Sequence, residues 1–440
     1  MNYQEAWVFL DNLQFFKIKL GLESMSQFLD SVGNPHRGLR FVHVAGTNGK
    51  GSVSTTLRTI LTRAGYKVGL YTSPHLSCVR ERFRIDGRFI SEEAFARQAS
   101  AIRAALGDRQ ITYFEFATAL ALLWFAEEQV NVAILEVGMG GRLDATNVVT
   151  PLVSVITNVS MDHEQYLGNT LAAVAFEKAG VIKPGVPVVA GVGPDDSLAV
   201  VAQVCEERKA PLYLLGREFE AVRGPEGSWE YRGIDHGHSL GNLHCRLKGG
   251  YQIGNAALAL AALETIAATL PVDGEAIRQG LLSVTWPGRL EYFCLADGNR
   301  VECPADQDPS LRRYLLDGAH NPAGVESLRD ALVSEFRYDH LILVWGCMGD
   351  KDVAATLIAI APLAERIIFT RPESERSATP EQLAAILPEE ERTKTLSAPT
   401  VKEALALAAD LAQSGDLICV AGSLYLVGAA RKILLGEVAP

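Results

Sequence analysis

The sequence has no excess of basic residues, and this absence limits the surfaces that the protein can bind. Its 440 residues include 41 Lys and Arg against 52 Asp and Glu, which gives a formal net charge of -11 at pH 7. Proteins that bind nucleic acid or an anionic membrane along an extended surface need clustered positive charge. We therefore expect no nucleic-acid partner, although this balance still allows a local basic pocket.

The sequence also lacks a long apolar run, a secretory signal and a paired-cysteine motif. No apolar run approaches the roughly 18 residues that span a bilayer. The first residues, MNYQEAWVFLDNLQFFK, carry acids within their apolar stretch and show no basic start or small-residue cleavage site. The seven cysteines are scattered without a C-x-x-C pair, as expected of reduced thiols. We therefore expect a cytoplasmic protein with no membrane partner.

Apolar strands alternate with helices over most of the chain. The strands VNVAILEV and PLVSVITNV are uniformly apolar and lie between helical segments, which indicates a parallel sheet covered on both faces. From about 205 to 250, short runs broken by Gly and Pro predict a small antiparallel sheet, and the alternation of strands and helices restarts near 296. We expect an α/β protein whose N-terminal P-loop-type ATPase domain, residues 1–295, has a mostly parallel sheet plus the small antiparallel one. A smaller Rossmann-like α/β domain, residues 296–440, follows it.

The segment HVAGTNGKGS, residues 43–52, is similar to a phosphate-binding loop but shorter. Gly46 stands two residues before Gly49, and Ser52 follows Lys50 at one remove, whereas the general pattern has a longer spacing and an adjacent Ser or Thr. An apolar strand precedes the segment and an amphipathic helix follows it, which is the context that such a loop needs. Backbone N–H groups and the lysine can then bind phosphate, and the serine hydroxyl can reach Mg²⁺. The competing interpretation is a strand-to-helix turn with a solvated lysine.

Other polar residues follow apolar strands, where open α/β sheets bind ligands. Glu136 ends one strand, His163 follows the next, and Asp317 with His320 ends a strand of the second domain. Taken singly, each also fits a bland explanation: a surface acid, a hydrogen-bonded structural histidine or an ordinary strand-end turn. The same holds for Lys178, which fits a solvated Glu–Lys helix face.

In chain order, the motifs GTNGKGS, TSPHL, EVGMGGRLDATN, TNVSMDHEQYLGNT, EKAGVIK, WPGRLE and DGAHNP resemble the folylpolyglutamate synthase and dihydrofolate synthase family of the Mur ligase superfamily. The resemblance runs from about residue 15 to about residue 430. It implies an ATP- and Mg²⁺-dependent, ADP-forming ligase that joins an acid to an amino acid. The phosphate contacts that it implies are Asn48, Gly49, Lys50, Gly51 and Ser52.

The resemblance also assigns residues outside the loop. It implies metal ligands at Ser73, Glu136, His163 and Lys178, the last as a carbamate, because a carbamate gives Mg²⁺ the oxygen ligand that it prefers. Lys50, His163 and Lys178 are the implied catalytic residues. Further nucleotide contacts are implied at Asn255, Arg289, Asp317 and His320.

The substrates that the resemblance implies are L-glutamate and either dihydropteroate or a reduced folate. The substrate's carboxylate takes the γ-phosphoryl group to form an acyl phosphate, which the glutamate amine then attacks. The implied pteroate contacts are the segment KIKLGLE, which contains Lys19, and the residues Thr112, Tyr113, Phe114, Glu115, Leu143, Asp144 and Ala145. Some relatives that make dihydrofolate carry an acid where Lys19 stands.

We therefore expect a bifunctional dihydrofolate synthase and folylpolyglutamate synthase that acts as a monomer. The nearest alternative is an enzyme that only extends folates already bearing a glutamate. More distant alternatives are another Mur-type amino-acid ligase and a non-catalytic ATP-binding module. The last would leave Glu136, His163 and Lys178 without a joint purpose.

Overall fold

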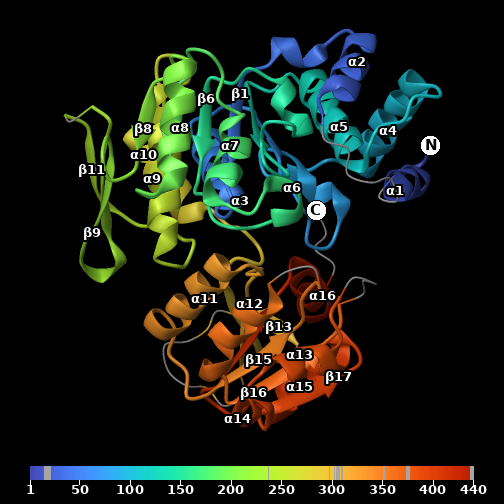
Figure 1. Ribbon diagram of the computed structural model, residues 1–440, viewed down its shortest axis with the longest axis vertical. Coiled ribbons are helices and arrows are strands. Elements are labelled where there is room, and N and C mark those ends of the chain that lie inside the picture. The colour runs from blue at the N-terminus through green and yellow to red at the C-terminus, as the bar shows by residue number, and fades with distance from the viewer. Residues whose placement is uncertain are drawn as a thin grey trace. The chain divides into compact units, whose positions relative to one another are not determined.

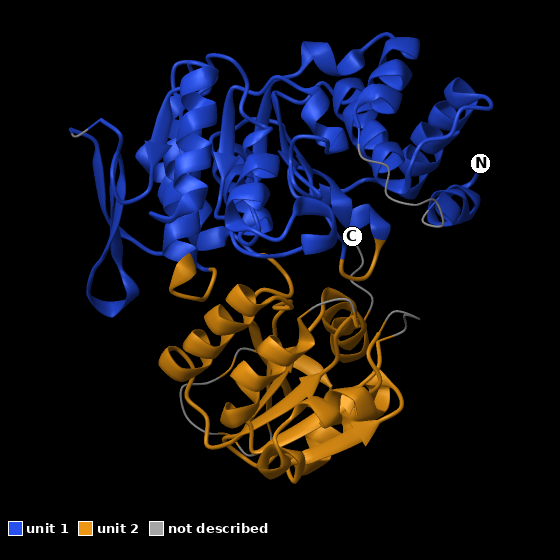
Figure 2. Ribbon diagram, viewed as in Figure 1, with its two compact units in different colours: residues 1–75, 79–246, 252–285 blue, residues 76–78, 247–251, 286–440 orange. Residues whose placement is uncertain are grey.

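The computed structural model describes residues 1–13, 21–235, 237–296, 298–301, 303, 308, 311–349, 352–372 and 377–436. The chain forms two compact units (Figures 1 and 2). The first comprises Met1–His75, Val79–Arg246 and Gln252–Thr285, and the second comprises Leu76–Cys78, Leu247–Tyr251 and Trp286–Pro440. Among the described residues, no helix is both long and apolar enough to cross a membrane.

The first unit is built on an eight-stranded sheet with the order β4-β3-β2-β5-β1-β6-β7-β8. The six strands from β2 to β8 pair in parallel, whereas β3 and β4 add an antiparallel edge. Their bounds are β1 Phe41–Ala45, β2 Val68–Tyr71, β3 Phe83–Ile85, β4 Arg88–Phe89, β5 Val132–Glu136, β6 Val153–Ile156, β7 Val188–Ala190 and β8 Leu212–Leu214.

Helices cover both faces of this sheet. Consecutive residues of a strand point to opposite faces, and in the central strands the residues on both faces are buried. Val42 and Val44 of β1 pack with one set of helices, α3, α9 and α10, whereas Phe41 packs with α1, α2, α4 and α5. Helices α7 and α8 complete the second face. The bounds are α1 Tyr3–Asn12, α2 Glu23–Ser31, η2 Pro35–Gly38, α3 Lys50–Arg63, η3 Val79–Arg82, α4 Glu92–Leu106, α5 Tyr113–Glu127, η4 Ala145–Val148, α6 Glu164–Leu167, α7 Leu171–Ala179, α8 Asp196–Glu207, α9 Tyr251–Thr265 and α10 Gly274–Ser283.

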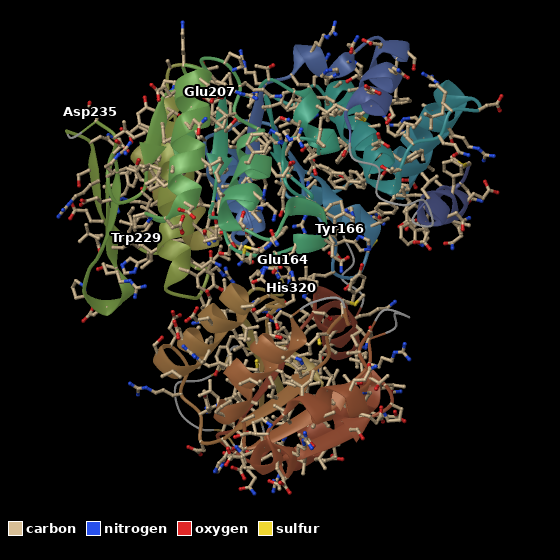
Figure 3. The ribbon with its side chains drawn as sticks, in the orientation of Figure 1. Glu164, Tyr166, Glu207, Trp229, Asp235 and His320 are labelled. Carbon is tan, nitrogen blue, oxygen red and sulfur yellow. A yellow bond between two sulfur atoms is a disulfide. The ribbon has the colours of Figure 1, made fainter. Side chains whose placement is uncertain are left out.

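A small antiparallel sheet of three strands, β11-β10-β9, also belongs to the first unit. It consists of β9 Glu220–Arg223, β10 Trp229–Arg232 and β11 Ser239–Leu243, with η5 Pro225–Gly227 in the first turn. Trp229, which is labelled in Figure 3, lies on β10. Together with Tyr231 it is buried in the same core as α9, so aromatic side chains anchor one face of the sheet. The predicted start near residue 205 was wrong, because β8 pairs in parallel with β7 and extends the main sheet.

The second unit contains a seven-stranded sheet with the order β13-β12-β14-β18-β15-β16-β17, in which β12 and β13 are antiparallel and the others parallel. Two cores cover its faces, one with α11, α12 and α13 and the other with α15 and α16. The bounds are β12 Glu291–Ala296, β13 Asn299–Val301, β14 Arg312–Leu316, α11 Pro322–Ser334, β15 Leu341–Trp345, α12 Val353–Ile360, η6 Ala361–Leu363, β16 Arg366–Thr370, α13 Pro380–Ile386, α14 Glu389–Arg392, β17 Thr395–Ala398, α15 Val401–Leu411, β18 Leu417–Ala421 and α16 Leu424–Leu435.

The mixed α/β architecture, with a mostly parallel first sheet, a small antiparallel sheet and a second α/β unit, is the one predicted from the sequence. Our predicted boundary fell after residue 295, whereas the main segment of the second unit begins at Trp286. The difference arises because β12 pairs with β14 and so forms part of the second sheet.

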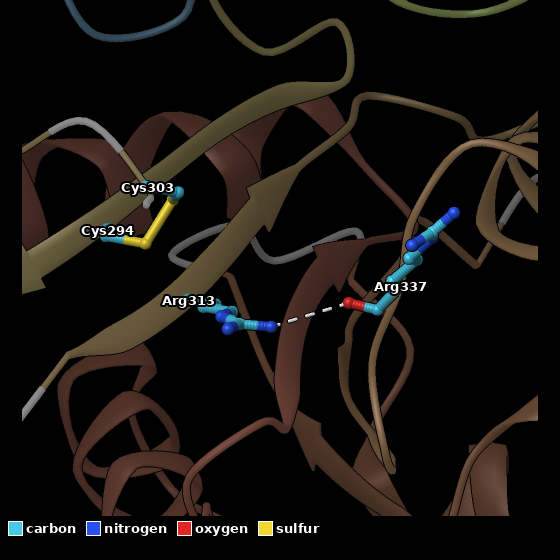
Figure 4. Close-up of a disulfide and its surroundings, with 4 residues drawn as sticks. All are labelled: Cys294, Cys303, Arg313 and Arg337. Carbon is cyan, nitrogen blue, oxygen red and sulfur yellow. Dashed lines mark hydrogen bonds between the residues drawn. A yellow bond between two sulfur atoms is a disulfide. The ribbon is translucent and has the colours of Figure 1, made fainter. Parts of the chain in front are cut away.

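A disulfide joins Cys294 to Cys303, so the prediction that all seven cysteines are thiols was wrong (Figure 4). Cys294 lies on β12 opposite Val301 of β13, so the hairpin brings the two cysteines together with their Cα atoms 5.1 Å apart. A hairpin can pair cysteines that are nine residues apart, which a search for closely spaced motifs does not detect. The other five cysteines remain thiols.

We predict that Leu57→Ala lowers the free energy of unfolding of the first unit by about 2–5 kcal/mol, because it leaves a cavity in the core under the sheet. Leu57 is fully buried on α3. Leu282→Ala is the matched control, because Leu282 lies on a helix of the same unit and is 49% exposed. Urea unfolding of both variants measures the difference, and equal losses would contradict the assignment of this core.

Candidate functional site

The Gly-Lys loop connects the end of β1 to the start of α3. Gly46 and Gly49 have φ angles of 144° and 83°, and Gly49 is the N-cap of α3 in the left-handed region. The helix therefore begins at Lys50 and directs its first N–H groups toward the loop, which is the arrangement that binds anions. The Lys50 Nζ donates hydrogen bonds to the carbonyl oxygens of Gly46 and Thr47, each at 3.0 Å. The lysine thus lies across the loop, where its charge can meet a phosphate.

The segment after β6 holds this loop in place. Thr47 and Ser160 exchange hydrogen bonds, since the Thr47 hydroxyl donates to the Ser160 carbonyl at 2.9 Å and accepts from the Ser160 N–H at 3.0 Å. The Asn158 side-chain oxygen accepts from the Asn48 N–H at 2.9 Å, and the Thr157 hydroxyl donates to the Asn48 carbonyl at 2.6 Å. A Cβ on Gly46 would lie 1.9 Å from the Thr157 Oγ1. Only glycine fits there, so the two segments form one packed surface.

Helix α9 supports the other side of the loop. The Gln252 Nε2 donates to the Ser52 Oγ at 3.2 Å, and the Asn255 Nδ2 donates to the Gln252 Oε1 at 2.9 Å. A Cβ on Gly49 would lie 2.6 Å from the Asn255 Oδ1. The structure therefore brings the predicted nucleotide contact Asn255 against the loop. Sequence reasoning missed Gln252, although its position three residues before Asn255 places both on one helix face.

Glu136 ends β5 beside the loop, since β5 pairs with β1. Its side chain is only 4% exposed, and its Oε2 accepts a hydrogen bond from the Ser73 N–H at 3.3 Å. Two of the predicted metal ligands are therefore in contact. Both can offer an oxygen atom to a hard cation such as Mg²⁺.

Lys178 lies near the end of α7 and is 3% exposed. Burial and the nearby positive charge of Lys50 lower its pKa to about 7, although the carboxylate of Asp162 acts in the opposite direction. Because Lys178 is buried, its interpretation as a solvated lysine on a Glu–Lys helix face is wrong. Lys50 of the phosphate loop is one of the charges that affect it. A substantial fraction of its amine is neutral near pH 7, which is the nucleophilic form.

His163 lies just before α6, in the left-handed region with a φ of 52°. The backbone N–H of His163 donates to the Asp162 Oδ1 at 2.8 Å, and the ring Nε2 of His163 lies 3.9 Å from the Asp162 Oδ2. Within the described ranges, no three His, Cys, Asp or Glu side chains are grouped so that they alone could hold a metal ion. The predicted ligand set contains two such residues, and Ser73 and Lys178 supply the remainder. Its donors fit a magnesium site because three of the four offer oxygen, if the lysine carries a carbamate.

The predicted substrate residues at the start of α5 have a structural role. Thr112 and Glu115 form a capping box: the Thr112 hydroxyl accepts from the Glu115 N–H at 3.2 Å, and the Glu115 Oε2 accepts from the Thr112 N–H at 2.7 Å. Ser24 of α2 also donates to Glu115. The Thr-x-x-Glu pattern is thus explained by helix capping. Contact with substrate stays a prediction.

The two aromatic residues between them face the neighbouring strands. Phe114 lies against Tyr71 of β2, with ring centroids 6.0 Å apart, and a Cβ on Gly138 would lie 2.6 Å from its ring. Tyr113 lies under the guanidinium of Arg82 at 5.2 Å. In the other predicted substrate segment, Leu143, Asp144 and Ala145, the last two are buried. Lys19, with most of the KIKLGLE segment, lies outside the described residues.

In the second unit, Arg289, Asp317 and His320 gather at the end of β14. Burial raises the pKa of Asp317 above its usual value, and the nearby positive charge of Arg289 offsets only part of this increase. The Asp317 carboxylate accepts hydrogen bonds from the N–H groups of Leu290 and Ala319, at 2.8 and 2.9 Å. His320, which is labelled in Figure 3, lies just before α11. Its Nδ1 is 2.7 Å from the Gly318 carbonyl oxygen. Asp317 thereby ties the Arg289 segment to the strand end.

Two protein-family models match the chain. The Mur ligase middle domain matches residues 44–263, and the Mur ligase glutamate ligase domain matches residues 299–424. The first match includes the Gly-Lys loop, Glu136, His163 and Lys178. The second includes Asp317 and His320.

Curated relatives match over nearly the whole chain. The folylpolyglutamate synthase of Lacticaseibacillus casei is 34% identical, with 99% of each chain covered. The dihydrofolate synthase/folylpolyglutamate synthase of Escherichia coli is 35% identical, with 98% of this chain and 95% of the relative covered. A probable bifunctional folylpolyglutamate synthase/dihydropteroate synthase of Haloferax volcanii is 35% identical over all of this chain, which spans only 51% of that relative. A Halobacterium salinarum relative with the same name is likewise covered over 51% of its length.

Solved structures of the same group share the fold. E. coli FolC in complex with DHPP and ADP superimposes with a TM-score of 0.86 at 34% identity, covering 98% of this chain and 97% of that one. A bifunctional folylpolyglutamate synthase/dihydrofolate synthase with Mn, AMPPNP and L-glutamate bound gives a TM-score of 0.85 at 32% identity, covering 99% and 98%.

We predict that Gly49→Ala weakens ADP binding by roughly tenfold or more, because the added Cβ meets Asn255 and strains a left-handed residue at the helix start. Gly65→Ala is the matched control. Gly65 follows the same helix and has a similar φ of 88°, but nothing lies within 4 Å of its Cβ position. Calorimetric titration with ADP distinguishes the two variants. If the Gly49 variant binds ADP as tightly as the Gly65 variant, the loop does not cradle phosphate.

Proposed function

The chain belongs to the folylpolyglutamate synthase/dihydrofolate synthase family of Mur ligases, and from this premise we propose that it is an ATP-dependent ligase that adds L-glutamate to dihydropteroate and to the glutamate tail of reduced folates. The observation that carries the proposal is the edge of the sheet where the half-buried Lys50 follows β1 and the buried Glu136 ends the neighbouring strand β5. The buried Lys178 of α7 lies close enough to Lys50 for its pKa to be lowered. An isolated Gly-Lys loop would support nucleotide binding alone.

Within the first unit, we assign ATP phosphates to the Gly-Lys loop. Gly49, Lys50 and Gly51 offer N–H groups, Lys50 adds one ammonium and Asn48 its side-chain amide, and Ser52 offers a hydroxyl that Gln252 already orients. Hydrogen bonds with Thr157 and Asn158 hold the loop in this conformation. Preorganised donors of this kind stabilise developing charge without reorganisation during the reaction.

Ser73, Glu136, His163 and a carbamylated Lys178 are the residues that would hold Mg²⁺. The bound ion would neutralise charge on the phosphate oxygens and help align them for transfer. Carbamate formation joins the neutral Lys178 amine to the carbon of CO₂ and releases a proton. The lowered pKa of about 7 supports this assignment, because it leaves the amine nucleophilic near neutral pH.

The reaction forms one amide bond and consumes one ATP. An oxygen of the substrate's carboxylate attacks the γ-phosphorus, the bond to the β-phosphate oxygen breaks, and ADP leaves. The amine of glutamate then attacks the acyl carbon, loses a proton and expels phosphate through a tetrahedral intermediate. Phosphoryl transfer depends mainly on alignment and charge neutralisation, which Lys50 can supply.

For the second unit, we propose that Arg289, Asp317 and His320 contact the nucleotide. Their support is local: the buried Asp317 binds two N–H groups, and its charge lies close to the Arg289 guanidinium. We propose in addition that the protein is cytoplasmic, where ATP is supplied, and that it acts as a monomer. The alternative is folylpolyglutamate synthase activity alone, which is the activity named for the L. casei relative.

The substrate assignment is tested with purified protein, Mg-ATP and L-glutamate, to which dihydropteroate or tetrahydrofolate is added separately. We expect ADP release and a product longer by one glutamate with each substrate. Turnover of tetrahydrofolate alone would favour the narrower activity. If ADP is released with neither dihydropteroate nor tetrahydrofolate, the ligase assignment is contradicted.

We predict that Lys178→Ala reduces kcat by at least about 100-fold, because the metal loses a ligand. Lys178→Glu, which restores a carboxylate oxygen, should retain more activity than the alanine variant.

Wild-type activity should rise as pH increases through about 7, since the neutral amine then predominates.

Removal of CO₂ followed by addition of bicarbonate provides the control for the carbamate. Bicarbonate should restore wild-type activity and leave the alanine variant unchanged. Wild-type activity in Lys178→Ala would show that no carbamate is needed.

A further inference from the structure

A chain of buried polar groups connects β1 to the turn after β5, within the first unit. His43 of β1 and Thr146 are fully buried, and Asp144 is 7% exposed. The His43 Nε2 lies 2.9 Å from the Thr146 Oγ1, and the Thr146 hydroxyl donates to the Asp144 Oδ1. Since the threonine hydrogen points to the carboxylate, the Thr146 oxygen accepts from His43. The chain therefore runs from the strand that ends at the Gly-Lys loop to a buried carboxylate.

Asp144 uses its carboxylate to hold the turn that follows Glu136. Its Oδ2 accepts hydrogen bonds from the N–H groups of Gly138 and Met139, both at 3.0 Å. Its Oδ1 accepts the Thr146 N–H at 3.0 Å in addition to the Thr146 hydroxyl. Four donors on one buried carboxylate satisfy it, and hydrogen bonds to a charged acceptor are among the stronger ones in proteins.

The turn held in this way lies between two predicted functional groups. Glu136, the predicted metal ligand, is two residues before Gly138. The Phe114 ring, a predicted substrate contact, lies so close to Gly138 that a Cβ there would be 2.6 Å from it. A shift of this turn would therefore move the surface that Phe114 packs against.

If these three polar residues served only to fill the core, apolar residues of similar volume would be expected in their place. Apolar residues would avoid the free-energy cost of desolvating a histidine and a carboxylate. The polar chain instead fixes hydrogen-bond directions at both its ends, which is what alignment of a strand end and a turn requires.

We infer that His43 and Thr146 are positioning residues, which act through Asp144 to hold the Gly138–Met139 turn against Phe114 and next to Glu136. The consequence for catalysis rests on the proposed ligase function, whereas the ordering of the turn does not. Neither residue needs to touch substrate, nucleotide or metal.

The ordering is tested by hydrogen–deuterium exchange of the Gly138 and Met139 amides in Thr146→Val and Thr146→Ser. The valine keeps the shape but removes the hydroxyl, and we expect roughly tenfold faster exchange. The serine keeps the hydroxyl and should retain protection. Thr59→Val is the matched control, because Thr59 of α3 is also buried in the first unit and its hydroxyl donates to the Thr55 carbonyl oxygen at 2.7 Å, outside this chain.

A second pair of variants keeps the test decisive if Thr146→Val does not fold. His43→Leu removes the donor and should also speed exchange at the turn, whereas His43→Gln keeps an N–H donor and should slow it again. Combined with Thr146→Val, His43→Leu should cause no further loss, because both act through one carboxylate. Unchanged exchange in Thr146→Val, or an equal increase in Thr59→Val, would overturn the inference.

The kinetic consequence is a selective rise in KM. In Thr146→Val, we expect KM for the folate substrate to rise roughly tenfold while KM for ATP changes by less than about twofold, with recovery in Thr146→Ser. An equal rise in both values would overturn the positioning role. If wild-type protein makes no amide, the proposed function fails, and the exchange result still decides whether the chain orders the turn.

Discussion

Positive charge buried at one edge of the first sheet is the constraint on which the rest of this structure depends. Lys178 is almost fully buried in the field of Lys50, and the Gly-rich start of α3 adds the positive end of a helix dipole. Like charges in a poorly solvated place repel each other, so they persist only with anions or after proton loss. Asp162 supplies part of the compensation, and the lowered pKa of Lys178 supplies another part. A triphosphate and a carbamate would complete it, which is why this edge suits phosphoryl transfer.

Rigidity is the second requirement, because positioned charges help catalysis only if they do not have to reorganise. Three separate segments provide it. The segment after β6 binds the loop through paired backbone and side-chain hydrogen bonds, α9 supports Ser52 and Gly49, and the His43–Thr146–Asp144 chain fixes the turn after Glu136. All three sets of contacts join residues within the first unit, so this part of the site is held in place by that unit's own residues.

Much of this arrangement was predictable from local pattern. The apolar run before GTNGKGS and the helix after it fixed the strand-loop-helix context, and the strand ends located Glu136, His163 and Asp317. The contacts across long sequence separations were not predictable in the same way. Gln252 meets Ser52 across 200 residues, and Cys294 meets Cys303 only because β12 and β13 form a hairpin. Local pattern also misplaced β8, whose Gly- and Pro-flanked run was typical of the small sheet although it pairs with β7. Glu115 shows a different limit of local pattern, since the motif that the resemblance assigns to substrate binding also has a complete explanation in helix capping.

We propose that this edge transfers a phosphoryl group to a carboxylate before glutamate attacks. This transfer is tested most directly by labelling the substrate's carboxylate with ¹⁸O and measuring the phosphate released during turnover with Mg-ATP and L-glutamate. An acyl phosphate carries one carboxylate oxygen into the phosphate that leaves, so we expect ¹⁸O in that phosphate in proportion to the amide formed. Amide formation with unlabelled phosphate would contradict it.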